Sequence, residues 1–105
     1  MTDFIVCFST IDSEKEAAKI AKALVEAKLA ACVNIVPKVT SVYEWKGSIC
    51  EETELLLVIK TQQSRLKELK ATLEELHPYE VPELIALPIT DGLPDYLGWV
   101  LANTK

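Results

Sequence analysis

The chain has 105 residues, half of them apolar, and it carries a net charge of −5 at neutral pH. This length is typical of one domain spanning residues 1–105, and the apolar fraction suffices for a core without disulfides or a structural metal. The negative charge argues against nucleic acid as a partner, because neutralising phosphates requires clustered lysine and arginine.

The three cysteines, Cys7, Cys32 and Cys50, are odd in number and widely spaced. They form no C-x-x-C motif, so the pattern is neither a disulfide framework nor a zinc knuckle. The first residues lack the basic region of a signal peptide, and no apolar segment approaches the roughly 20 residues of a membrane helix. We therefore expect a cytoplasmic protein that does not contact a membrane.

The first part of the chain predicts a strand followed by a helix. Residues 4–8 form a continuous apolar run rich in strand formers. Ser13, with Glu16 three residues later, is a capping box that predicts the start of a helix. The apolar positions that follow recur with helical spacing and fade at Lys28. They are Ala17, Ile20, Ala21, Leu24 and Val25.

Residues 32–61 predict a long hairpin. Residues 32–36 and 39–45 are strand-like, and Pro37 between them lacks a backbone donor, so it belongs at a bulge or an edge. We expect one long, bent strand. Gly47 predicts the turn, because glycine readily adopts positive φ. Residues 49–61 return as the second strand.

The last part predicts a helix, a strand and a short helix. Ser64 is the expected N-cap, and Pro78 ends the helix because the residue before a proline disfavours helical geometry. The apolar positions of this helix are Leu66, Leu69, Leu73 and Leu76. Residues 81–89 predict a long final strand, and Pro94 starts a third helix.

The predicted order is βαββαβ plus a terminal helix, which is the ferredoxin-like α+β arrangement with an antiparallel sheet. Both main helices would cover one face of that sheet. Residues 4–8, 55–59 and 84–87 are nevertheless apolar at consecutive positions, so the second face is apolar too. Each large apolar side chain left there would forgo about 1.5–3 kcal/mol of burial. This predicts an oligomer; the alternative is that the third helix covers the second face.

Several motifs resemble those of the CutA divalent-cation-tolerance family. They are LAACVNIVP at 29–37, SVYEWKG at 41–47, IKT at 59–61, HPYEVPE at 77–83 and YLGW at 96–99. The resemblance covers nearly the whole chain, from about Phe4 to Trp99, and the second and fourth motifs are together highly specific.

The resemblance implies a homotrimer similar to that of PII signalling proteins, with strand pairing between subunits. It also implies binding of copper or another divalent metal ion and a role in the response to such ions, rather than an enzymatic reaction. The alternatives are a small-molecule sensor and a trimeric scaffold. Ser9 and Leu76 stand where some relatives have a cysteine and a histidine, which argues against a high-affinity copper site.

Three residues are candidate metal ligands: His77, Glu80 and Cys32. His77 is the only histidine, and neutral imidazole suits copper and zinc. A single histidine needs partners, so a structural histidine at a helix C-terminus is the alternative. For Cys32, as for Cys7, a buried structural thiol is the alternative.

Five residues of the family motifs are candidate ligand-binding residues of a cleft between subunits: Tyr43, Trp45, Lys60, Tyr79 and Trp99. Lys60 and Glu80 would be its polar pair. Apolar walls with a few fixed polar groups are typical of small-ligand sites. The alternative is that the aromatic residues only pack an interface. Motifs for nucleotide binding, zinc peptidases or nucleophilic catalysis are lacking in the sequence.

Overall fold

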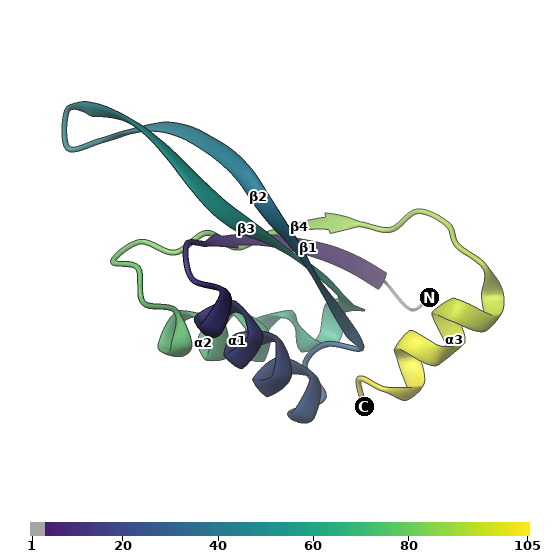
Figure 1. Ribbon diagram of the computed structural model, residues 1–105. Helices are drawn as coiled ribbons and strands as arrows, with labels where there is room; N and C mark the ends of the chain where they lie inside the picture. The colour runs from purple at the N-terminus through teal and green to yellow at the C-terminus, as the bar shows by residue number, and fades with distance from the viewer. Residues whose placement is uncertain (1–3) are drawn as a thin grey trace.

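Two helices pack against one face of a four-stranded antiparallel sheet in the computed structural model, which describes residues 4–105 (Figure 1). The strands are ordered β2-β3-β1-β4. The elements are β1 (Phe4–Ile11), α1 (Glu14–Glu26), β2 (Cys32–Trp45), β3 (Ser48–Gln62), α2 (Leu66–Leu76), β4 (Ile85–Pro88) and α3 (Pro94–Ala102). The α+β class and the βαββαβ order expected from the sequence are confirmed.

The core lies between the sheet and helices α1 and α2. Buried and partly exposed residues alternate along β1, because successive side chains of a strand point to opposite faces. Leu57 and Ile59 of β3 are fully buried and pack with Ile20 and Leu24 of α1 and with Leu69 of α2. The helical periodicity read from the sequence therefore identifies the helix faces that build the core, except that Val25 at the end of α1 is 41% exposed.

Local signals set both ends of α1. The Ser13 hydroxyl accepts a hydrogen bond from the backbone N–H of Glu16 at 3.2 Å, as expected for an N-cap. At the other end Lys28 adopts a positive φ of 59°, and the N–H of Leu29 donates to the carbonyl of Leu24. This is a Schellman termination, which usually has glycine at the left-handed position.

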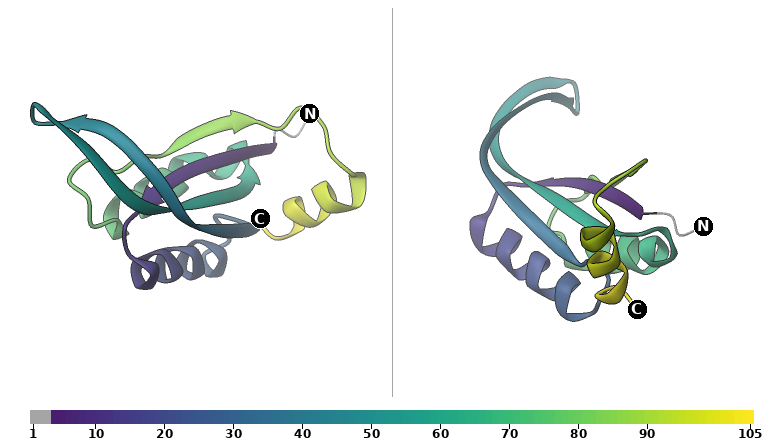
Figure 2. Two further views of the ribbon diagram at one scale, coloured as in Figure 1. Left: turned by 45° about the horizontal axis from the view of Figure 1, so that its top comes forward. Right: turned by 90° about the vertical axis from the view of Figure 1, so that its right-hand side faces the viewer.

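The β2–β3 hairpin bends where it leaves the rest of the sheet. Its register shifts between Val36 and Val39, so two β2 residues stand opposite Leu55 of β3. Such a bulge bends the strand and increases its twist. β1 pairs with β3 only as far as Ile11, which lies opposite Leu55. The rest of the hairpin therefore projects beyond the sheet and arches away from it (Figure 2).

The hairpin ends in a two-residue turn at Lys46 and Gly47, which both have positive φ, 50° and 84°. This is the signature of a type I′ turn. The projection elongates the molecule: its radius of gyration is 14.3 Å, against about 13 Å for a compact chain of this length. The expected bent strand, bulge and turn are thus all present.

Two expectations about the second half are wrong. Ser64 does not cap α2: it lies in the 3-10 turn Gln63–Arg65, and the helix starts at Leu66 without a side-chain cap. The final strand is Ile85–Pro88 and not 81–89, because only these four residues pair with β1. Their partners in β1 are Ile5 to Phe8. The preceding residues instead form a loop around the end of β1 (Figure 1).

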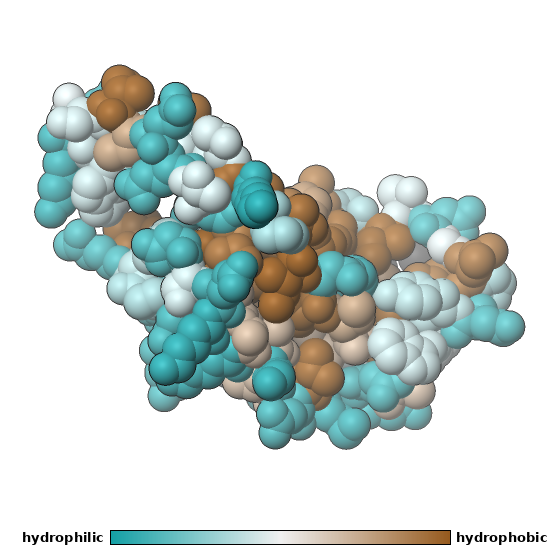
Figure 3. Space-filling view, in the orientation of Figure 1, coloured by the Kyte–Doolittle hydropathy of each residue, from teal (hydrophilic) through white to brown (hydrophobic). Residues whose placement is uncertain are grey.

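The sheet face opposite α1 and α2 is largely apolar and is not covered by any element within residues 4–105, and we call it the free face. Val58, Phe8 and Ile85 lie side by side across three strands, and Lys60, Val6 and Leu87 form the neighbouring row. Ile85 and Leu87 are 51% and 42% exposed. Figure 3 shows hydrophobic residues gathered along the middle of the molecule, where the sheet lies.

Helix α3 does not cover the free face. It lies beyond one end of the sheet (Figures 1 and 2). The buried side chain of Val100 holds it in place, together with the Gln62 amide, which donates to the carbonyl and hydroxyl oxygens of Thr104. The alternative that the third helix shields the second face therefore fails for this subunit.

Candidate functional site: a cleft beneath the hairpin

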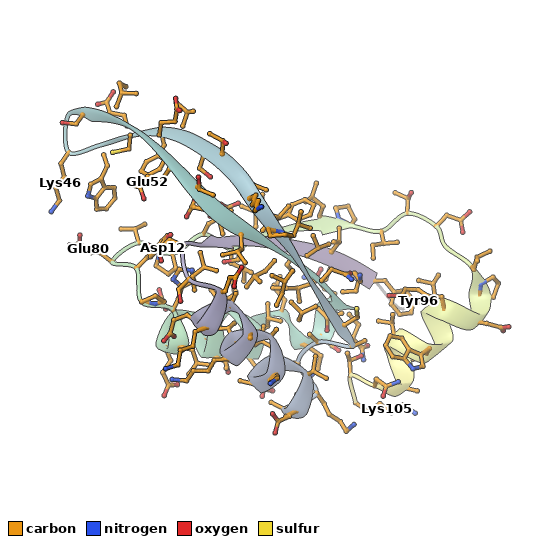
Figure 4. The ribbon with its side chains drawn as sticks, in the orientation of Figure 1. Asp12, Lys46, Glu52, Glu80, Tyr96 and Lys105 are labelled. Carbon is orange, nitrogen blue, oxygen red and sulfur yellow. The ribbon has the colours of Figure 1, made fainter. Side chains whose placement is uncertain are left out.

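A cleft of about 700 Å³ lies between the arched hairpin and the loop that joins α2 to β4. Hairpin residues form one wall, the loop forms the other, and Thr10 at the end of β1 contributes to the lining. In Figure 4 the labelled side chains of Lys46 and Glu52 come from the hairpin, and Glu80 and Asp12 lie below them. The cleft exists because the bulge turns the hairpin over this loop.

His77 attaches the loop to the end of β1. Its Nε2 donates to the carbonyl of Thr10 at 2.9 Å, and its Nδ1 accepts the backbone N–H of Tyr79 at 3.2 Å. His77 is 6% exposed, and its ring packs edge-on against the Tyr79 ring with 4.6 Å between the ring centroids. These two bonds define a neutral imidazole with both nitrogens in use. A metal ion could bind His77 only by displacing one of them.

Two tyrosines of the cleft donate to carboxylates of β3. The Tyr79 hydroxyl donates to Glu54 at 2.5 Å, and the Tyr43 hydroxyl donates to Glu52 at 2.9 Å. Desolvation and the Glu54 contact raise the pKa of Tyr79 far above its ordinary value. The hydrogen bond to Glu52 is the main reason that the pKa of Tyr43 rises to about 12. Both hydroxyls therefore remain donors at physiological pH.

The cleft is strongly acidic. Its lining includes five carboxylates: Asp12, Glu52, Glu54, Glu80 and Glu83. Among the residues that the structure describes, none of those lining the cleft is basic, although the Lys46 ammonium at the hairpin tip approaches the Glu80 carboxylate to 3.9 Å and lies 5.7 Å from the centre of the Trp45 ring. Among residues 4–105, no three histidine, cysteine or acidic side chains are close enough together to hold one metal ion.

The structure brings some of the predicted site residues together and separates others. Tyr43, Trp45, Tyr79 and Glu80 all line the cleft, with His77 directly behind them. The other three predicted residues, Cys32, Lys60 and Trp99, do not line the cleft.

Cys32 and Lys60 lie opposite each other on β2 and β3, where both contact Asn34 on the free face. Trp99 lies on α3, with its ring 5.7 Å from that of Tyr96. Lys60 and Glu80 are therefore not paired within one subunit, and the three candidate metal ligands do not meet there. A polar pair of Lys60 and Glu80, and a metal site shared by the three candidate ligands, remain predictions that concern the assembled subunits.

Sequence reasoning did not assign Asp12, Glu54 and Glu83 to a site. Asp12 follows β1, and Glu54 comes just before the bulge partner Leu55. Glu83 is the last residue of the HPYEVPE motif and lies in the irregular loop before β4. Glu83 accepts a hydrogen bond from Thr10, 73 positions away in the chain. No local sequence signal could have connected these residues.

Fold and cleft together define a small α+β protein with βαββαβ topology and an acidic cleft with aromatic walls. Residues 5–103 match the family model described as CutA1 divalent ion tolerance protein. The chain therefore belongs to the CutA1 divalent ion tolerance family.

Curated relatives agree with this membership. The "Divalent-cation tolerance protein CutA" of Thermus thermophilus is 52% identical over 94% of this chain and 96% of its own length. The solved structure of that organism's CutA1 superposes with a TM-score of 0.94, covering 97% and 99% of the two chains at 51% identity.

Two eukaryotic relatives are longer than this chain. Mouse "Protein CutA" is 54% identical over 93% of this chain and 55% of its own length. "Protein CutA, chloroplastic" of Arabidopsis thaliana is 48% identical over 96% of this chain and 56% of its own length. The chain thus spans about half the length of these two proteins. Within residues 4–105, none of the helices has the length and apolarity needed to cross a membrane.

Proposed function

We propose that this chain is a homotrimeric, cytoplasmic protein that binds divalent cations, copper among them, and contributes to tolerance of these ions. The role is binding rather than catalysis, since the family description and the names of its relatives refer to ion tolerance and not to a reaction. The three cysteines are free thiols, which supports a reducing compartment. Cell fractionation with an antibody against the chain tests the location; recovery outside the cytoplasm would contradict it.

The observation that carries the trimer is the free face. Ile85 and Leu87 are about half exposed, so covering each would add about 1 kcal/mol of hydrophobic stabilisation. The hairpin tip also presents Val42 and Ile49 to solvent, 64% and 74% exposed. An apolar face of this extent is typical of a subunit interface, and the projecting hairpin has the reach to contact a neighbour. The number three comes from the family resemblance.

Sedimentation velocity tests the assembly. The wild type is expected at three times the 11.7 kDa chain mass at micromolar concentration. Leu87→Asp places a charge on the free face and is expected to sediment as a monomer. Val25→Asp is the matched control, because Val25 is 41% exposed on α1, away from the free face. A wild-type monomer, or equal dissociation of both variants, would contradict the trimer.

The cation role is supported by the acidic cleft and by the net charge of −5. Since residues 4–105 of one subunit form no three-ligand metal site, we propose that neighbouring subunits complete it, with Glu80, His77 and Cys32 as ligands. Calorimetric titration with Cu(I), Cu(II) and Zn(II) tests this. Glu80→Gln and Leu87→Asp should lose binding, whereas Glu51→Gln, outside the cleft, should not. Saturable binding to the Leu87→Asp monomer would refute the shared site.

The shape of the cleft favours a second candidate, a small-molecule sensor comparable to PII proteins. A volume of about 700 Å³ suits a small organic ligand, and the aromatic walls supply apolar contact area. A thermal-shift screen of metabolites against the wild type and Trp45→Ala tests it. Unchanged melting with every compound would argue against a small-molecule ligand.

A further inference from the structure

The carboxylates of the cleft are distributed rather than clustered. Five acidic residues line it, yet no three of the described ones are close enough to hold a single ion. A compact metal ion gains most of its affinity from several oxygens at one point. Negative charge spread along a cleft instead matches a ligand that carries positive charge at several separate points.

Glu54 is a buried carboxylate with no counter-ion in the part of the chain that the structure describes. It is 5% exposed, and among residues 4–105 the one hydrogen-bond partner of its carboxylate is the Tyr79 hydroxyl. No lysine or arginine of the described chain forms an ion pair with it. Buried charges in proteins are usually paired, because desolvating an unpaired one costs free energy. Glu54 lines the cleft, so a cation entering from solvent could reach it.

The chain itself already places one alkylammonium at the cleft. The Lys46 ammonium lies 3.9 Å from the Glu80 carboxylate and 5.7 Å from the centre of the Trp45 ring. The carboxylate supplies charge and the aromatic face supplies a cation–π contact. Both side chains of the ion pair are more than 70% exposed, so the pair is weak and easily displaced.

We infer that the cleft binds an aliphatic di- or polyamine, with ammonium groups against the dispersed carboxylates and methylene spacers against Tyr43, Trp45 and Tyr79. The inference rests on the small-molecule role proposed above and names its ligand class. Each ammonium donates hydrogen bonds to carboxylate oxygens, and each spacer covers an aromatic surface. Lys46 competes for the mouth of the cleft as a tethered amine.

Calorimetric titration with spermidine tests the inference, with hexaamminecobalt(III) as a compact ion of equal charge that lacks apolar spacers. Spermidine is expected to bind at least about tenfold more tightly, which corresponds to about 1.4 kcal/mol, since its methylenes contact the aromatic walls. Trp45→Ala should remove most of that difference. Equal affinity for the two cations in the wild type would show that only net charge attracts them and would overturn the inference.

Charge variants locate the site. Glu52→Gln should weaken spermidine binding about three- to fivefold, whereas Glu51→Gln, the same charge change outside the cleft, should leave it within about twofold. Lys46→Asn, which keeps a residue tolerant of positive φ in the turn, should strengthen binding about twofold. Equal losses at Glu51 and Glu52 would overturn the assignment to the cleft.

Sedimentation and titrations on the same protein sample distinguish a failure of this inference from a failure of the proposed function. If the wild type sediments as a trimer and binds Cu(II) or Zn(II) but shows no saturable binding of spermidine, the amine assignment fails and the cation-binding trimer stands. If it neither assembles nor binds metal ions, the proposed function fails, whatever the result with spermidine.

Discussion

Replacing Tyr79 with phenylalanine tests whether the contact between the loop and the hairpin stabilises the cleft. The substitution deletes only the hydroxyl that donates to Glu54 at 2.5 Å. Glu54 is 5% exposed, so its carboxylate would lose its hydrogen-bond partner without gaining full access to water. Hydrogen bonds to charged groups contribute about 1.5–3 kcal/mol, and we expect Tyr79→Phe to lower the free energy of unfolding by about 2 kcal/mol.

Tyr43→Phe is the matched control. It deletes the same atom from a hydrogen bond to Glu52, but on the exposed hairpin, where water replaces the lost partner. Its effect should stay below about 0.5 kcal/mol. Urea unfolding followed by tryptophan fluorescence measures both variants, at one fixed protomer concentration because association stabilises the folded state. If Tyr79→Phe and Tyr43→Phe lower the free energy of unfolding equally within error, the reasoning is refuted.

Adding Glu54→Gln to the Tyr79→Phe variant tests the cause. If the loss arises from an unsatisfied buried charge, removing that charge should restore part of the stability. A double variant that is less stable than Tyr79→Phe would show that the carboxylate is not the source of the cost.

The pH dependence supplies a further check on the same contact. The folded-state pKa of Tyr79 is raised above its ordinary value of 10.0. The corresponding stabilisation is therefore fully present below pH 10 and is lost as pH rises toward the raised folded-state pKa. The stability difference between the wild type and Tyr79→Phe should shrink above about pH 10; a difference that grows there would contradict the sign of the shift.

Other substitutions probe single structural features. The hydroxyls of Ser9 and Thr61 are buried and have no hydrogen-bond partner among residues 4–105, so Ser9→Ala and Thr61→Val should each raise the free energy of unfolding by about 1 kcal/mol in urea titrations; destabilisation would contradict this. Ser13→Ala removes the N-cap of α1 and should cost about 1 kcal/mol, whereas an unchanged midpoint would show that the cap is dispensable. Burial raises the pKa of the Cys7 thiol to about 11, so iodoacetamide at pH 8 should label Cys7 only after unfolding; mass spectrometry showing labelled native Cys7 would contradict its burial.

Local patterns were enough to predict most of the elements. The capping residue Ser13, the helical spacing of Ile20 and Leu24, and the turn at Gly47 each act within a few residues, so the sequence displays them directly. Where the local signal was ambiguous, the prediction failed: Ser64 lies within the 3-10 turn that leads into α2, a helix that has no side-chain cap. The strand at 81–89 was predicted too long because pairing with β1 decides its extent.

The sequence by itself determined the order of the elements, the apolar second face of the sheet and the family motifs that hold Tyr43, Trp45 and Tyr79. Only the tertiary structure decided which residues share a site. The bulge opposite Leu55 turns the hairpin over the loop, and the bond from His77 to Thr10 joins residues 67 positions apart. Both depend on long-range contacts, which local propensity does not encode, so the acidic character of the cleft became visible only in the folded chain.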